Sequence, residues 1–184
     1  MRERFLKFMH PSLITPSINN IQIKDFEKIV INIGLGKLRI QSQFEDKILP
    51  EVVKEIGLIT GQKPALRRAK KSIAGFKTRT GDIIGLQTTL RGKRMVFFFL
   101  KVINVVLPRV KDFRGIDSKN VDENGNLNVG LKEQYVFPEI NIEKSKVNFG
   151  LQITVVPRIK KRVAAFDLYK DIGLPLKSFI KERK

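Results

Sequence analysis

Short runs of apolar residues, several of them rich in β-branched side chains, constrain the fold of this chain most strongly. Residues 28–34 form a β-branched run that ends in glycine, and residues 83–90 are a second candidate. Residues 151–156 alternate apolar and polar side chains, and residues 65–70 are a shorter candidate. Runs of this kind, bounded by turn residues, predict strands. Strands and helical patterns are interspersed without a regular strand–helix–strand alternation, so the pattern favours an antiparallel sheet.

Two segments have the spacing of helices. Apolar residues recur at helical intervals over residues 44–56, with Pro50 inside the first turn and Gly61 just beyond the pattern. Glycine is favoured at the residue that follows a helix, so we expect this helix to end before Gly61. Residues 94–107 are apolar nearly all round, which predicts a buried helix that Pro108 stops.

Turn residues mark a hairpin and a long loop. Residues 122–126 are Asp-Glu-Asn-Gly-Asn, and Asn-Gly favours a turn with positive φ, so we expect a hairpin over residues 121–138. Residues 71–82 have no clear period and contain two glycines, which predicts a long loop. The tail from Arg158 mixes basic residues with a candidate short helix.

These elements predict an α+β fold: a largely antiparallel sheet with helices packed on one face, a long basic loop and a hairpin extension. The chain has 184 residues, of which 42% are hydrophobic, so it can bury a core of its own. We expect a single domain over residues 1–184, with an N-terminal extension at residues 1–20 and a basic tail at residues 157–184.

The charge of the chain predicts its partner. There are 36 lysines and arginines against 18 aspartates and glutamates, which gives a net charge of +18 and a pI of about 10.3. A compact body this basic repels itself unless a polyanion neutralises it. Nucleic acid is the expected partner, and an anionic membrane surface is the alternative. The longest apolar stretch, residues 95–107, is interrupted by Lys101 and Asn104 and is too short to cross a bilayer, which needs about 20 residues.

Motifs for other chemistry are incomplete. A dinucleotide-binding loop would need a third glycine after Gly34 and Gly36, and Arg39 stands in its place. Residues 120–125 imitate the first half of a calcium loop, but Leu131 occupies the position of its bidentate acid. The chain has no cysteine, and His10 is its only histidine, so thiolate metal sites are excluded and a histidine site has little support.

Several acids are scattered along the second half of the chain: Asp112, Asp117, Glu133 and Glu139. Two of them could meet in space as an acid–base pair. Ion pairs with the many lysines and arginines are the favoured interpretation. We therefore expect no enzymatic activity, no cofactor, no metal site and no small-molecule substrate.

One segment concentrates the positive charge. Residues 61–114 hold fourteen lysines and arginines but only two acids, Asp82 and Asp112, and so carry +12 of the whole +18. Part of this excess lies on residues 70–81, among glycines and hydroxyl side chains. Lysine and arginine neutralise phosphates and release counterions, and hydroxyls bond phosphate or ribose. Phe76 could stack on an exposed base or could anchor the loop to the core.

The same segment carries a family resemblance. Residues 61–81, GQKPALRRAKKSIAGFKTRTG, resemble the signature of the L-five family of large-subunit ribosomal proteins. The similarity covers residues 20–156 in order, and it includes the strand at residues 28–34 with its glycine pair. The ends depart from the family pattern, as does Lys37, which stands where many members have an acid.

The resemblance implies a structural component of the large ribosomal subunit. It implies binding to 5S rRNA and large-subunit rRNA in the central protuberance, contact with P-site tRNA through the basic loop, and a bridge to a protein of the small-subunit head. The residues expected to bind RNA are Asn32, Gly34, Gly36, Gln62, Lys63, Arg67, Lys70, Ser72, Thr89, Arg91 and Arg94. Those expected in the tRNA-contacting loop are Lys71, Gly75, Phe76, Lys77 and Arg79. Those expected in the bridge region are Arg109, Asp112 and Arg114.

Composition also suggests a source. Isoleucine, lysine, asparagine and phenylalanine are plentiful and alanine is scarce, which is typical of an AT-rich coding genome. Together with the diverged tail and the absence of an import signal, this composition favours an organelle-encoded protein of the mitochondrial matrix. A bacterial or plastid ribosome is the alternative. A non-ribosomal RNA-binding chaperone or processing factor is the alternative function.

Overall fold

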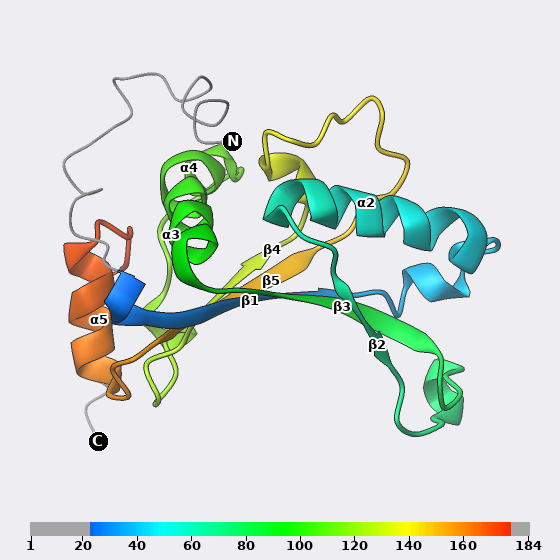
Figure 1. The fold of residues 1–184 in the computed structure, drawn as a ribbon, viewed down its shortest axis with the longest axis horizontal. Coiled ribbons are helices and arrows are strands. Elements are labelled where there is room, and N and C mark those ends of the chain that lie inside the picture. Colours follow the sequence, from blue (N-terminus) through cyan, green and yellow to red (C-terminus); the bar gives the residue numbers. More distant parts are fainter. Residues whose placement is uncertain (1–22, 178–184) are drawn as a thin grey trace.

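Five antiparallel strands form one sheet in the order β2-β3-β1-β5-β4 (Figure 1). The structure, a computed structural model, describes residues 23–177; the expected extension at residues 1–20, with His10, lies outside them. The strands are β1 (Phe26–Gly34), β2 (Ala65–Arg68), β3 (Ile83–Leu90), β4 (Leu127–Leu131) and β5 (Leu151–Pro157). The predicted strands are confirmed, although β2 ends two residues early.

The central strand shows why the sheet has two unlike faces. Along β1, Ile29, Ile31 and Ile33 are buried, while Val30 and Asn32 between them are only half-buried. Successive side chains of a strand point to opposite faces, so the isoleucines define the core face. Their cross-strand partners on β3 and β5 follow the same alternation. The helices cover this core face, as the α+β prediction requires.

The first helix begins and ends as expected. A π-helical turn (Phe44–Ile48) leads into α2 (Leu49–Thr60), which has Pro50 in its first turn. Proline is tolerated there because its missing N–H has no partner in the first turn anyway. Gly61 closes the helix with φ of 71°, and its N–H donates to the Gly57 carbonyl oxygen at 2.9 Å. Such a left-handed C-cap favours glycine.

The second helix corrects two expectations. It runs from α3 (Gly92–Lys101) through a π-helical turn (Val102–Val106) to α4 (Leu107–Arg109), so Pro108 does not stop it. The π-helical turn resets the backbone hydrogen bonds, and Pro108 falls in the first turn of α4, where no N–H is needed. Nor is the helix buried all round, because Phe97 is 60% exposed on the side away from the sheet.

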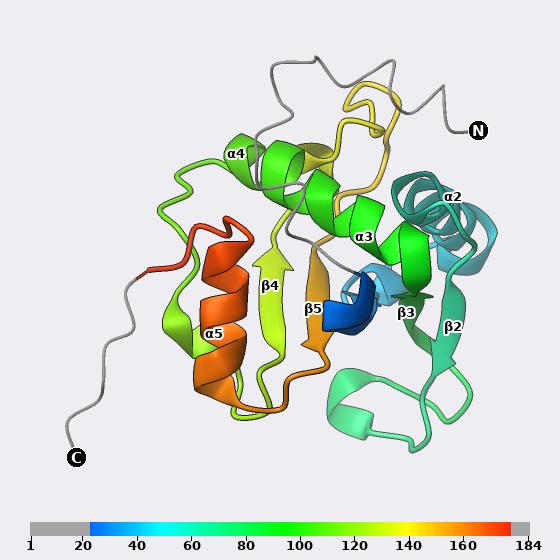
Figure 2. The same cartoon turned by 60° about the vertical axis from the view of Figure 1, so that its left-hand side comes forward.

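The last helix, α5 (Arg162–Asp171), lies along the β4 edge of the sheet (Figure 2). Its Ala165, Phe166 and Tyr169 are buried, and the rings of Phe26 and Tyr169 lie 6.2 Å apart. The Phe26 ring also lies 5.2 Å from that of Phe99 in α3. The candidate helix of the tail is therefore confirmed, and this part of the tail belongs to the core.

The hairpin predicted at residues 121–138 is wrong in extent. Its turn forms, with the Asn126 N–H donating to Asp122 Oδ1 at 2.7 Å and Gly125 at φ of 80°. Only one bridge, Val121 to Leu127, joins the two arms. The reason is that the segment before the turn is a 3₁₀ turn (Ser118–Asn120) and not a strand, so β4 pairs along its length with β5 instead. Within residues 23–177, no helix is long and apolar enough to cross a bilayer.

Candidate RNA interface

The face of the sheet opposite the helices is open and polar. Strand register places Gln87 of β3, Asn32 of β1 and Gln152 of β5 side by side in one row across it. The next row holds Thr154 and Asn128, with Thr89 at its far end on β3. In Figure 1 the helices α2, α3 and α4 all lie on the other side of the sheet. Amides and hydroxyls of this kind can both donate and accept hydrogen bonds.

Several of these side chains hold one another in place. The Thr154 hydroxyl donates to Asn128 Oδ1 at 2.7 Å, and Gln152 Nε2 donates to the same oxygen at 3.2 Å. On the other side of β1, the Arg67 guanidinium donates to Gln87 Oε1. The Asn32 amide, between the two groups, makes no hydrogen bond to any described residue. Asn32 is therefore free to bind a partner at the centre of the face.

The structure brings part of the expected RNA-binding set onto this face. Asn32, Arg67 and Thr89 lie on it, and Gln62 at its rim donates from Nε2 to the Thr89 carbonyl oxygen at 2.8 Å. Lys63 is exposed between α2 and β2. Sequence reasoning missed Gln87, Asn128, Gln152 and Thr154. The polar positions of the alternating run at residues 151–156 could have identified two of them.

Two expected arginines lie elsewhere. Arg94 is exposed in the first turn of α3, in the helical layer, and so does not join the open face. Arg91 lies just before α3, with its guanidinium 4.0 Å from the Glu27 carboxylate. A hydrogen bond from Lys28, together with its charge, lowers the pKa of Glu27, and Lys160 and Arg91 add to the effect.

The glycine pair needs a correction. Glycines at positions 34 and 36 could be required either for a φ that other residues avoid or for close approach of a partner. Neither has a positive φ, and a Cβ at either position would meet nothing within 4 Å. The first explanation is therefore wrong. Only the approach of a binding partner is left as a reason for glycine there.

The basic loop, residues 69–82, is a small hairpin rather than an irregular loop. Its two arms are joined by mutual backbone hydrogen bonds between Ile73 and Thr78, at 2.9 and 3.1 Å. A short 3₁₀ turn (Ala74–Phe76) forms the tip, and the hydroxyls of Ser72 and Thr80 lie 3.1 Å apart across it. Lys70 and Ser72, expected with the RNA-binding set, thus belong with the tRNA loop residues Lys71, Gly75, Phe76, Lys77 and Arg79.

Arg39 clamps the base of this hairpin. Its guanidinium donates to the Asp82 carboxylate and to the Lys77 carbonyl oxygen. The Arg79 N–H donates to Asp82 Oδ2 at 2.6 Å, and this bond, together with the Arg39 charge, lowers the pKa of Asp82. One of the two acids in the basic segment is thereby neutralised. Phe76 is 74% exposed, so it does not anchor the hairpin to the core.

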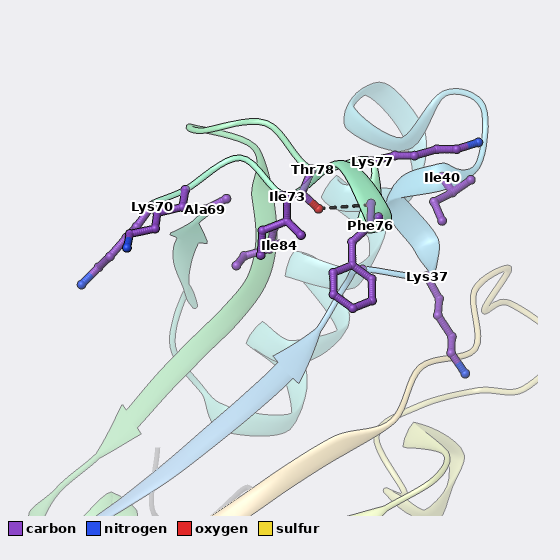
Figure 3. A pocket seen from close by; sticks show the side chains of 12 residues that line it. Lys37, Ile40, Ala69, Lys70, Ile73, Phe76, Lys77, Thr78 and Ile84 are labelled. Atoms are coloured by element: carbon purple, nitrogen blue, oxygen red, sulfur yellow. Dashed lines mark hydrogen bonds between the residues drawn. The ribbon is translucent and has the colours of Figure 1, made fainter.

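A hollow of about 870 Å³ separates the hairpin from the turn after β1 (Figure 3). Its apolar side chains include Ile40, Ile73, Phe76 and Ile84, all of them partly exposed to solvent. Lysines stand around them, and none of the lining residues is acidic. The remaining lining residues are Gly36, Lys37, Ala69, Lys70, Lys71, Gly75, Lys77 and Thr78.

The expected bridge residues form a separate group. Arg109 ends α4, Asp112 has a left-handed backbone with φ of 55°, and Arg114 is exposed just beyond it. Figure 1 places α4 at the opposite end of the molecule from the basic loop. The two regions could therefore contact different partners at the same time.

Two of the four scattered acids, Glu139 and Asp117, form the ion pairs that were expected. The Glu139 carboxylate lies 2.6 Å from Lys101 Nζ, and the Asp117 carboxylate lies 2.7 Å from Lys177 Nζ. Among the residues that the structure describes, no group of histidines and acids could hold a metal ion.

An α+β protein with one open polar face and a cationic hairpin at its end has the features of the RNA-binding class. Its sequence matches the family model of ribosomal protein L5 over residues 19–79 and the model of that family's C-terminus over residues 83–176. The chain belongs to the ribosomal L5 family. It is therefore a large-subunit ribosomal protein of translation, associated with rRNA and with other ribosomal proteins.

Relatives named large ribosomal subunit protein uL5 agree over most of the chain. That of Halothermothrix orenii is 46% identical over 158 residues, covering 85% of this chain and 86% of the relative. That of Latilactobacillus sakei is 41% identical over 177 residues, covering 95% of this chain and 96% of the relative. Both sources are bacteria, so these relatives give no support to the mitochondrial assignment drawn from composition. These relatives agree with a bacterial ribosome, which was the alternative to the mitochondrial assignment.

Proposed function

We propose that this protein binds 5S rRNA through the open face of its sheet and seats that RNA in the central protuberance, while also contacting large-subunit rRNA. The observation that carries the proposal is the row of unpaired or mutually oriented amides centred on Asn32, with Arg67 beside it. Arginine supplies the phosphate contacts, and the amides supply directed contacts to ribose and base edges. A flat polar sheet face suits the wide, shallow minor groove of an RNA helix.

Two further contacts belong to this proposal. The basic loop, with Lys71, Lys77 and Arg79 at one end of the molecule, would contact P-site tRNA. The group of Arg109, Asp112 and Arg114 at the other end would contact a protein of the small-subunit head. Their separation supports the two roles, because a bridging protein needs independent surfaces.

The role is structural, with no membrane partner, no small-molecule substrate and no catalysis. The alternative, a non-ribosomal RNA chaperone or processing factor, would use the same basic surface. Co-sedimentation separates the two: a ribosomal component stays with the large subunit through a salt wash that removes loosely held factors. Loss of the protein from the subunit at moderate salt would favour the alternative.

A single substitution tests the open face. Asn32→Asp puts a negative charge at its centre and should weaken 5S rRNA binding at least about tenfold, by repelling phosphate. Asn141→Asp is the matched control, because Asn141 is exposed in the segment between β4 and β5, on the helical side of the sheet. Its Oδ1 accepts a bond from the Glu143 N–H that an aspartate would keep. Equal losses for the two variants would contradict the assignment of the face.

A further inference from the structure

The hollow beside the basic loop exposes several large apolar side chains to solvent. Phe76 is 74% exposed and Ile40 is 68% exposed, and both line it. Large apolar side chains grouped in an open hollow cost solvation free energy unless something covers them. In Figure 3 the side chains of Ile73, Phe76 and Ile84 gather at the centre of the hollow.

The charge around the hollow indicates an anionic occupant. Lys70 lies on one side of the apolar group and Lys37 and Lys77 on the other (Figure 3), and Lys71 also lines the hollow. No lining residue is acidic. The nearest acid in the hairpin, Asp82, is already bound by Arg39. Among the described residues, no carboxylate forms an ion pair with any of these four ammonium groups.

Two glycines add an independent observation. Gly36 and Gly75 both line the hollow, neither has a positive φ, and a Cβ at either would meet nothing within 4 Å. The folded chain therefore does not need glycine at these positions. Bare backbone here keeps the hollow open and lets a flat group approach closely.

We infer that the hollow binds one unstacked nucleobase of an RNA strand, with the Phe76 ring against the base and the lysines on its flanking phosphates. Aromatic rings pair with unstacked bases, and lysines track the backbone on either side. An acidic protein segment is disfavoured, because an exposed aromatic ring with lysines on both sides favours a planar group between two phosphates. This inference deepens the proposed function and rests on it, since it names the RNA feature that the basic loop would hold.

The test uses the full chain and two single-stranded RNA octamers, one of uridines and one with abasic sugars at all eight positions. Both strands carry the same phosphate charge, so only contacts to the base distinguish them. The wild-type chain should bind the abasic strand about tenfold more weakly. Phe76→Ala should remove that difference, whereas Phe97→Ala, at a 60% exposed ring on α3, should keep it.

Gly36→Leu supplies a second variant that leaves the ring and the charge unchanged. The new side chain would fill the hollow, and its Cβ would meet no protein atom, so the fold should persist and the difference between strands should vanish. Equal binding of the two strands by the wild type, or a difference that survives Gly36→Leu, would overturn the inference. The inference would also be overturned if an acidic amphipathic peptide bound in place of the strand and Phe76→Ala abolished the binding of that peptide.

Binding of 5S rRNA, measured on the same samples, separates this inference from the proposed function. A wild-type chain that binds 5S rRNA normally but does not distinguish the strands contradicts the inference alone. A wild-type chain that binds neither RNA contradicts both.

Discussion

Tyr169 ties the last helix to the sheet through one buried hydroxyl. That hydroxyl donates to the Gly125 carbonyl oxygen at 2.9 Å and lies 3.3 Å from the Val155 carbonyl oxygen. Burial raises the pKa of the Tyr169 hydroxyl, so the hydroxyl stays protonated. Tyr169→Phe removes the donor and should lower the free energy of unfolding by about 1 kcal/mol. Tyr135→Phe is the control, since its hydroxyl reaches the Val147 carbonyl oxygen only at 3.5 Å. Urea denaturation showing equal losses for both variants would contradict the assigned role.

Glu55 gives a residue-scale prediction about pH. Burial raises the pKa of this carboxyl above its ordinary value of 4.5, against the lowering effect of hydrogen bonds from Ser145 and Gln134. A raised pKa means that the charged form destabilises the folded state, so its cost appears as the pH rises through the folded pKa. Glu55→Gln should therefore be more stable than the wild type at pH 7, and the difference should vanish below pH 4.5. Urea denaturation at several pH values checks this; a difference that grows towards acid pH would contradict it.

At the scale of elements, the basic loop should act independently of the sheet. Replacing Lys71, Lys77 and Arg79 with alanine should change the free energy of unfolding by no more than about 0.5 kcal/mol each, because all three lie at the surface of the hairpin. Binding of 5S rRNA should stay mostly intact, and P-site tRNA should dissociate faster from ribosomes that carry the variant. Unchanged tRNA dissociation rates would mean that the loop charge serves another partner.

The hydrogen bonds of the hairpin change what we expect for its dynamics. A loop with almost no apolar anchor apart from Ile73 and Phe76 would be mobile until RNA ordered it. The amides of Ile73 and Thr78 now have backbone partners, and that of Arg79 is held by Asp82. Hydrogen exchange on the free protein should protect these three amides, and Asp82→Ala, which removes the acceptor, should expose the amide of Arg79. Exchange of all hairpin amides at the rate of an unfolded chain would show that the clamp does not persist in solution.

Elements were predictable from sequence where one local pattern decided them. The β1 and β3 strands follow from β-branched runs, and the Gly61 cap follows from backbone chemistry alone. The extent of the hairpin was not predictable, because the pairing of β4 with β5 joins segments far apart in the sequence and no local pattern shows it. The Arg39 clamp was missed for the same reason, since it joins residues 43 positions apart.

At the scale of the whole molecule, the candidate site was predictable in kind but not in arrangement. Composition and the basic segment indicated a nucleic-acid partner, the family resemblance indicated RNA, and Asn32, Arg67 and Thr89 do share a face. The helix predicted at residues 94–107 already includes Arg94, but no local signal shows that Gln87 lies on one side of Asn32 or that Gln152 lies on the other. Those facts depend on strand order and register, which place residues from three separate segments in one row.

The net charge of +18 also requires a distinction between attraction and recognition. Lysines and arginines will draw the protein to any RNA, with an affinity that falls steeply as salt rises. Directed contacts, such as those proposed for the open face, are needed to favour one RNA over another. Specificity should therefore persist, or increase, at salt concentrations where non-specific binding is lost.

The most direct test is the affinity of the full chain for 5S rRNA and for an unrelated structured RNA of the same length, measured across a salt titration. At about 0.15 M salt, where screening limits exposed charges to roughly 8 Å, we expect submicromolar binding to 5S rRNA. Binding to the unrelated RNA should be at least about tenfold weaker. Equal affinity for the two RNAs at that salt would contradict a specific 5S rRNA interface and leave only the attraction of a basic protein for phosphate.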